Sequence, residues 1–180
     1  MRHKYETRCL VLARSHTGEA NTFVTLLTPD LGLVHARAQS LRKSGAKLAA
    51  ALATLTESEV VLVRGKEGWR LTGAVLEENW FARLGHPALL RTARVSNLFL
   101  RLVAGEMQNP DLFPIMKGFL ESLATAPESD HEAIEILTVL RVLAALGLDA
   151  GDIPVGLAEV LKTRSAYIAR INAGILASGL

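Results

Sequence analysis

Hydrophobic and polar residues alternate in short runs over residues 5–76, the pattern of strands that bury one face and expose the other. Glycines and a Pro-Asp-Leu-Gly sequence at 29–32 separate these runs, and such residues favour tight turns. The pattern predicts five strands, with a short helix rich in Ala and Leu between the third and the fourth. The expected strands are 5–15, 22–28, 33–39, 58–64 and 69–76, and the expected helix is 48–55. Three strands, a helix and two strands is the element order of the five-stranded OB-fold barrel, which commonly binds nucleic acid.

The third expected strand has two different faces. Val34, Ala36 and Ala38 point to one side, as core residues would. The other side is mostly polar and includes His35 and Arg37. We therefore expect this second face to front a groove.

Helical spacing of the apolar residues replaces the alternation after a polar break at 77–79. The expected helices are 87–107, 111–126, 130–148 and 156–178. The third of these is the clearest, because Ser129 or Asp130 can cap its start. The sequence thus predicts an α+β protein of two domains. An OB-fold nucleic-acid-binding domain spans residues 1–78, and an all-α helical bundle domain spans residues 79–180.

Charge is unevenly distributed along the chain, although the net charge is only +2. Residues 1–73 contain 11 Lys and Arg against 6 Asp and Glu, whereas residues 74–180 contain 9 against 12. A basic first part beside an acidic second part indicates that a polyanion meets the first part only. The alternative is ordinary variation of surface charge.

The cationic residues of the first part are the candidate DNA contacts. A flexible basic loop at 40–47 can follow a phosphate backbone, although a solvated loop whose charge serves solubility fits equally well. Trp69 has two interpretations as well: it stacks on a base, or it plugs one end of the barrel. The expected DNA-binding residues are Arg14, Arg37, Arg42, Lys43, Lys47, Arg64, Lys66, Trp69 and Arg70.

Catalysis and metal binding are not expected. Ser44 and Lys47 have the S-x-x-K spacing of penicillin-interacting enzymes, but the S-D-N and K-T-G motifs of those enzymes are missing. The five histidines are scattered, and Cys9 is the only cysteine and is expected in the core, so we predict no metal site and no cofactor. No uncharged run approaches the roughly 18 residues that span a bilayer, and the N-terminus lacks the apolar run of a signal peptide. We therefore expect a cytoplasmic protein without membrane contact.

Several short segments together resemble a known family. They are LVLAR at 10–14, GEA at 18–20, VTLLT at 24–28, LG at 31–32, RKS at 42–44, WRLTG at 69–73 and LRVLAALGL at 140–148. In this order they are similar to RecO, a family of bacterial recombination mediators. The likeness is good over the N-terminal domain and looser over the helical part.

The resemblance implies an N-terminal OB domain and a C-terminal helical domain. It also implies binding to single- and double-stranded DNA, annealing of complementary strands, and a nucleoid-associated location. The implied partners are RecR and RecF, with which the family loads recombinase onto DNA coated by single-strand-binding protein. The helical domain of the family binds the acidic, hydrophobic tail of that protein. Many members carry a four-cysteine zinc cluster, which this chain lacks, so it resembles a short form without zinc.

Two other functions stay open on the residues alone. One is a protein-interaction adaptor whose OB barrel binds a protein, without direct DNA binding. The other is a hydrolase that uses Ser44 and Lys47.

Overall fold

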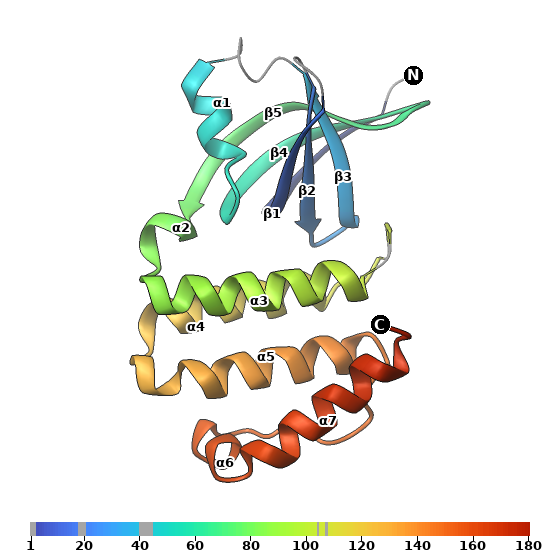
Figure 1. The fold of residues 1–180 in the computed structure, drawn as a ribbon. Helices are drawn as coiled ribbons and strands as arrows, with labels where there is room; N and C mark the ends of the chain where they lie inside the picture. The colour runs from blue at the N-terminus through green and yellow to red at the C-terminus, as the bar shows by residue number, and fades with distance from the viewer. Residues whose placement is uncertain (1–2, 18–20, 40–44, 104, 107) are drawn as a thin grey trace. The chain divides into compact units, whose positions relative to one another are not determined.

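The protein is described by a computed structural model that covers residues 3–17, 21–39, 45–103, 105–106 and 108–180 (Figure 1). The chain forms two compact units. The first comprises Met1–Arg83 and Gly105–Phe113, and the second comprises Leu84–Ala104 and Pro114–Leu180. The domain boundary expected after residue 78 stays a prediction, because compact packing does not show that either part folds alone. In the described part of the chain, no helix combines the length and the hydropathy that crossing a membrane requires.

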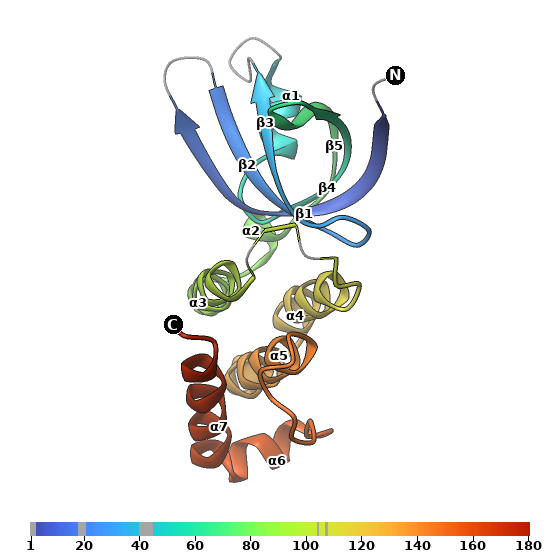
Figure 2. The ribbon, with the colours of Figure 1, turned by 90° about the vertical axis from the view of Figure 1, so that its right-hand side faces the viewer.

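The first unit is a closed five-stranded barrel, as the strand pattern predicts (Figure 2). Its strands are β1 (Lys4–Thr17), β2 (Asn21–Thr28), β3 (Gly32–Gln39), β4 (Thr56–Gly65) and β5 (Gly68–Asn79). They follow one another around the barrel in the order β1-β2-β3-β5-β4. All neighbours are antiparallel except β3 and β5, which run parallel. This arrangement confirms the OB barrel.

Alternation of side chains across each strand builds the barrel core. On β3, Val34, Ala36 and Ala38 are buried, as the sequence predicts. Leu26 of β2 and Leu62 of β4 meet them inside the barrel. Each fully buried Leu contributes about 1.5–3 kcal/mol through the removal of its side chain from water.

Helix α1 spans Gly45–Ala51 and packs against β4 and β5 (Figure 1), so the expected range of 48–55 was wrong at both ends. Side chains of β4 satisfy the carbonyl group of the last helical residue, Ala51. The hydroxyl groups of Thr56 and Ser58 both donate to the Ala51 carbonyl oxygen, at 2.9 and 2.7 Å. Leu55 then adopts a φ of 63°, which lies outside the right-handed helical region.

Strand β5 continues to Asn79, so the polar break expected at 77–79 was wrong. Glu78 and Asn79 pair with Glu57 and Thr56 of β4, beyond a β-bulge. Polar residues suit this strand end because Glu77 lies exposed there and Glu78 and Asn79 are half-buried. A short helix that the pattern did not predict, α2 (Trp80–Arg83), follows directly and buries Trp80.

The second unit is helical, as expected, but its last helix is divided. The helices of this part of the chain are α3 (His86–Leu102), α4 (Leu112–Thr125), α5 (His131–Ala145), α6 (Leu157–Lys162) and α7 (Arg164–Ala177), with a 3₁₀ turn at Glu128–Asp130. A single helix over 156–178 was wrong because Thr163, at φ −113° and ψ 26°, leaves the helical conformation. Its hydroxyl donates to the Glu159 carbonyl oxygen at 2.9 Å, which ends α6.

Helix α5 is the centre of the helical unit and packs against α3, α6 and α7. On one side, Glu135 of α5 accepts hydrogen bonds from Arg91 and Arg94 of α3, at 2.5 and 2.8 Å. Burial of the Glu135 carboxyl opposes its ionisation. The hydrogen bonds from the two guanidinium groups outweigh this effect and hold the pKa of Glu135 below its ordinary value. Glu135 is therefore ionised at neutral pH and forms ion pairs that link α5 to α3.

Cys9 provides a test of the barrel core. Its side chain has no exposed surface, and burial, the largest influence, raises the pKa of its thiol to about 12. We expect no reaction with a thiol-specific reagent at pH 8 in the folded protein and full reaction in urea. Because the folded pKa lies above the unfolded value, Cys9 should favour folding below pH about 9, and this contribution should be lost as the pH rises toward 12. Rapid labelling of the folded protein would contradict the barrel packing.

Candidate nucleic-acid interface

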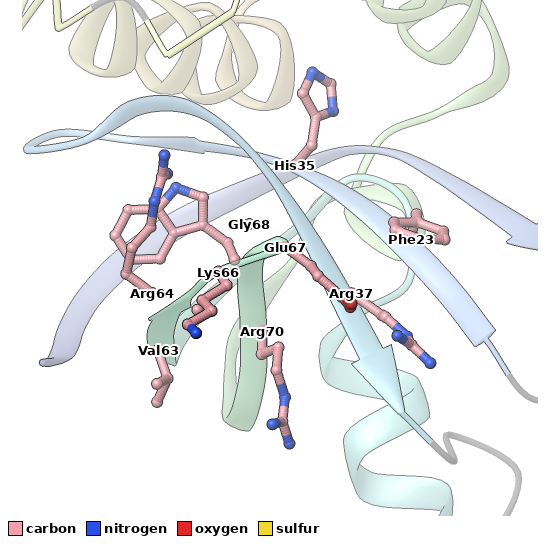
Figure 3. Close-up of a pocket in the computed structure, with 11 residues that line it drawn as sticks. Phe23, His35, Arg37, Val63, Arg64, Lys66, Glu67, Gly68 and Arg70 are labelled. Carbon is pink, nitrogen blue, oxygen red and sulfur yellow. The ribbon is translucent and has the colours of Figure 1, made fainter. Parts of the chain in front are cut away.

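A groove with a cavity volume of about 710 Å³ lies on the barrel, over β2, β3 and the β4–β5 hairpin (Figure 3). It is lined by Phe23, His35, Arg37, Val63, Arg64, Gly65, Lys66, Glu67, Gly68, Trp69 and Arg70. The strand 2–3 face and the loop between strands 4 and 5 are where OB folds bind oligonucleotides. The polar face expected on β3 does front this groove, through His35 and Arg37.

Strand register places a row of side chains across the groove. Phe23 of β2 pairs with Arg37 of β3, and Arg37 pairs with Arg70 of β5. Arg70 pairs in turn with Val63 of β4. One phenylalanine and two arginines, contributed by three strands, thus occupy neighbouring positions across the sheet. Spacing between neighbouring strands of a sheet is about 4.8 Å, so the row presents a recurring set of contacts rather than one point charge.

The β4–β5 hairpin supplies one edge of the groove. Gly65 and Gly68 pair across a two-residue turn made of Lys66 and Glu67. Gly68 has a φ of 105°, a conformation that favours glycine in tight hairpins. The turn therefore presents two exposed charged side chains, Lys66 and Glu67, next to the arginines.

Positive charge dominates the lining. Arg37, Arg64, Lys66 and Arg70 are cationic, whereas Glu67 is the one carboxylate among the eleven lining residues. A groove with low-dielectric walls and one sign of charge concentrates its field, so anions are attracted into it. Arginine also donates two parallel hydrogen bonds to a phosphate, which makes this lining suited to a phosphate backbone.

Trp69 belongs to the barrel core, with only 7% of its surface exposed. Its ring and that of Tyr5 pack edge to face at a centroid distance of 5.2 Å, and the Arg64 guanidinium carbon lies 4.8 Å from the Trp69 ring centroid. Its indole Nε1 donates to Glu106 at 2.8 Å. Of the two interpretations of Trp69, this geometry matches the barrel plug. Contact between Trp69 and DNA stays a prediction. It would involve the small exposed part of the ring that lines the groove.

Among the described residues, two of the predicted contacts, Arg14 and Lys47, are not in the lining of the groove. Arg14 of β1 pairs with Val24 and is half-buried. Within the described part of the chain, its Nε atom has no hydrogen-bond partner. Lys47 is exposed on α1. Arg42 and Lys43 lie outside the described residues, and so does Ser44 of the S-x-x-K spacing.

Two groove residues were missed by the sequence reasoning as DNA contacts, Phe23 and His35. Phe23 is 40% exposed, although its neighbour Val24 is fully buried. Alternation on β2 places Phe23 on the face that does not carry Val24. An aromatic side chain on this outward face could have identified Phe23 as a candidate contact. His35 Nδ1 lies 3.1 Å from the Thr25 hydroxyl across the β2–β3 pair. The sequence alone does not reveal this contact, because it depends on how β2 and β3 pair.

The barrel and its cationic groove define an OB-fold protein with a surface suited to a polyanion. Residues 1–79 match the model of the family described as "Recombination protein O N terminal". The chain is 32% identical over 129 residues to DNA repair protein RecO of Dehalococcoides mccartyi, an alignment that covers 71% of this chain and 51% of that protein. It is also 32% identical over 165 residues to DNA repair protein RecO of Heliobacterium modesticaldum, covering 86% and 58% of the two chains.

The chain belongs to the RecO family. It spans about half the length of the relatives that it matches.

Phe23 provides a test of the groove as a site for single strands. Phe23→Ala should weaken binding of a fluorescent oligonucleotide by about 1–3 kcal/mol, the contribution of one base stacked on an aromatic ring. Phe23→Trp should preserve binding, since it keeps an aromatic face. Phe81→Ala is the matched control, because Phe81 is 60% exposed on α2 and does not line the groove. Equal effects of the Phe23→Ala and Phe81→Ala changes on fluorescence anisotropy would contradict stacking on Phe23.

Proposed function

We propose that this chain acts in DNA repair by recombination, as a non-catalytic mediator that needs no cofactor. The barrel binds single- and double-stranded DNA, and the bound strands anneal. The observation that carries this proposal is the pairing of Arg37 with Arg70 in a groove that Lys66 also lines. Membership of a family whose relatives are named DNA repair protein RecO supports it.

Binding through this groove depends on phosphates. Each phosphate that an arginine or lysine neutralises releases condensed counterions, so affinity falls as the salt concentration rises. Contacts of this kind position a strand without reading its sequence. A strand held by its backbone keeps its base edges available to a complementary strand, which is the requirement for annealing.

The proposed partners are RecR, RecF and the tail of single-strand-binding protein, and loading of recombinase is the proposed outcome. The helical unit offers a hollow of about 260 Å³ that suits an acidic, hydrophobic tail. Its walls include the apolar side chains of Phe119, Ile134 and Leu137, and Arg141 lies exposed among its lining residues. A hollow that combines apolar side chains with one cation can take an apolar side chain together with a carboxylate.

The groove charges test the function directly. Exchanging Arg37 and Arg70 for Glu should weaken DNA binding at least about tenfold, because a hydrogen bond to a charged group contributes about 1.5–3 kcal/mol. The salt dependence for single strands should also flatten, by about 0.7 in log–log slope for each phosphate that the variant no longer neutralises. Anisotropy titrations with single- and double-stranded oligonucleotides at several salt concentrations measure both effects.

Arg8→Glu is the matched control for this experiment. Arg8 is an exposed arginine of the same barrel that does not line the groove. If Arg8→Glu weakens binding as much as the exchange of Arg37 and Arg70, DNA does not use the groove. If the unchanged protein binds no DNA at any salt concentration, an adaptor that binds protein is the better account.

The hollow in the helical unit has its own test. Arg141→Glu should weaken binding of a synthetic peptide with an acidic, hydrophobic C-terminal tail at least about tenfold, because the substitution replaces attraction by repulsion at a carboxylate. Isothermal titration calorimetry measures the affinity. Arg101→Glu is the control, since Arg101 is exposed on α3 and is not among the hollow's lining residues. Unchanged affinity in Arg141→Glu would remove the hollow as the site of the tail.

A further inference from the structure

Glu106 lies in the chain between α3 and α4, yet it belongs to the same compact unit as the barrel. One oxygen of its carboxylate accepts two hydrogen bonds, from Arg64 Nη1 at 2.5 Å and from Trp69 Nε1 at 2.8 Å. Both donors come from residues that line the groove. A carboxylate that is not part of the barrel's own sequence thus occupies two donors at the groove's edge.

Arg64 is oriented differently from Arg37 and Arg70. The charged ends of those two arginines point to the lower part of Figure 3, whereas that of Arg64 points to its upper part. The ion pair with Glu106 and the stacking on Trp69, at 4.8 Å, account for this orientation. The charge of Arg64 is therefore already paired with a carboxylate from a distant part of the sequence.

The donors that Glu106 occupies are those that a phosphate oxygen would use. A guanidinium group and an indole N–H converge on one anionic oxygen, which is the geometry of a phosphate contact. We propose that Glu106 is an internal competitor of the nucleic acid: its carboxylate takes the place of one phosphate at Arg64, and a bound strand displaces it. This inference rests on the proposed DNA binding of the groove and adds its regulation.

Displacement is feasible because the ion pair is open to water. The side chains of Arg64 and Glu106 are 47% and 44% exposed, and exposed ion pairs contribute little to stability. Trp69, in contrast, is held in the core and stays in place when Glu106 leaves. Arg64 can then turn toward the phosphates that Arg37 and Arg70 hold.

The Glu106 carboxylate lowers the affinity of the groove for a nucleic-acid strand. It also links binding of the strand to the segment between α3 and α4. While Glu106 is paired, its negative charge offsets one of the four groove cations. When a strand replaces it, the connection from α3 to α4 is released from Arg64 and Trp69. A mediator that must release DNA to other proteins benefits from such a limit, because a weaker complex dissociates faster.

Glu106→Gln tests the proposal, because glutamine keeps an oxygen acceptor for Trp69 and removes the charge. Binding of a fluorescent single-stranded oligonucleotide should tighten about three- to fivefold, the scale of one exposed ion pair. The log–log salt slope should steepen by about 0.7, since Arg64 gains a phosphate. Thermal unfolding of both proteins checks that the variant is folded.

Arg64→Gln in both backgrounds completes a double-mutant cycle. The substitution should weaken binding more in Glu106→Gln than in the unchanged protein, because Arg64 reaches DNA fully only when the Glu106 charge is removed. Glu67→Gln is the matched control: it removes a carboxylate from the groove lining without releasing Arg64 from Glu106, so the effect of Arg64→Gln should stay the same.

The outcomes separate this inference from the proposed function. If the unchanged protein binds DNA and Glu106→Gln binds with equal affinity, Glu106 does not compete with DNA. The proposed DNA binding is then unaffected. Weaker binding by Glu106→Gln would overturn the proposed competition too, because Glu106 would then position Arg64 for DNA. If no form binds DNA, both the inference and the proposed function fail.

Discussion

The short parallel pairing between β3 and β5 is the contact on which the site depends. Among the described residues, three pairs form it: Ala36 with Trp69, Arg37 with Arg70, and Ala38 with Leu71. It closes the barrel, and by alternation it sends Ala36, Ala38, Trp69 and Leu71 into the core. The central pair points the other way, so the pairing that seals the core also places two arginines side by side in the groove. A shift of one residue in this register would bury the arginines and expose the core.

This constraint explains why the core and the proposed binding site use the same few strands. Apolar side chains on one face hold β2, β3, β4 and β5 around a common interior. The opposite face is then presented at fixed spacings, and a rigid strand positions a charge more accurately than a mobile loop does. Like charges at paired positions oppose strand pairing. The three-residue contact is thus maintained by the burial of Ala36, Ala38, Trp69 and Leu71, and a polyanion in the groove would strengthen it.

Sequence patterns predicted the local parts of this arrangement well. Alternation on β3 identified both its buried and its polar face, and the element order identified the barrel. Predictions failed where strand pairing or local backbone conformation, and not hydrophobic periodicity, determines the structure. Polar residues at 77–79 suggested a break, yet β4 extends the sheet by pairing with Glu78 and Asn79. Continuous helical spacing hid the interruption at Thr163, whose backbone conformation is not visible in a hydrophobic pattern.

In the candidate site, too, the sequence predicted some features and missed others. Charge counting predicted Arg37, Lys66 and Arg70, because an excess of cations is a property of composition. The partnership of Phe23 with Arg37 and the carboxylate that Glu106 brings to Arg64 depend on register and on a contact across 42 residues of sequence. Single-residue propensities contain no information about such contacts.

Mapping of backbone amide chemical shifts in a nitrogen-labelled protein, titrated with a short thymidine oligonucleotide, tests the central claim most directly. The account predicts that the largest changes follow the row from Phe23 through Arg37 to Arg70 and the adjoining hairpin at Lys66. Changes that avoid β2, β3 and the β4–β5 hairpin and gather elsewhere would contradict it.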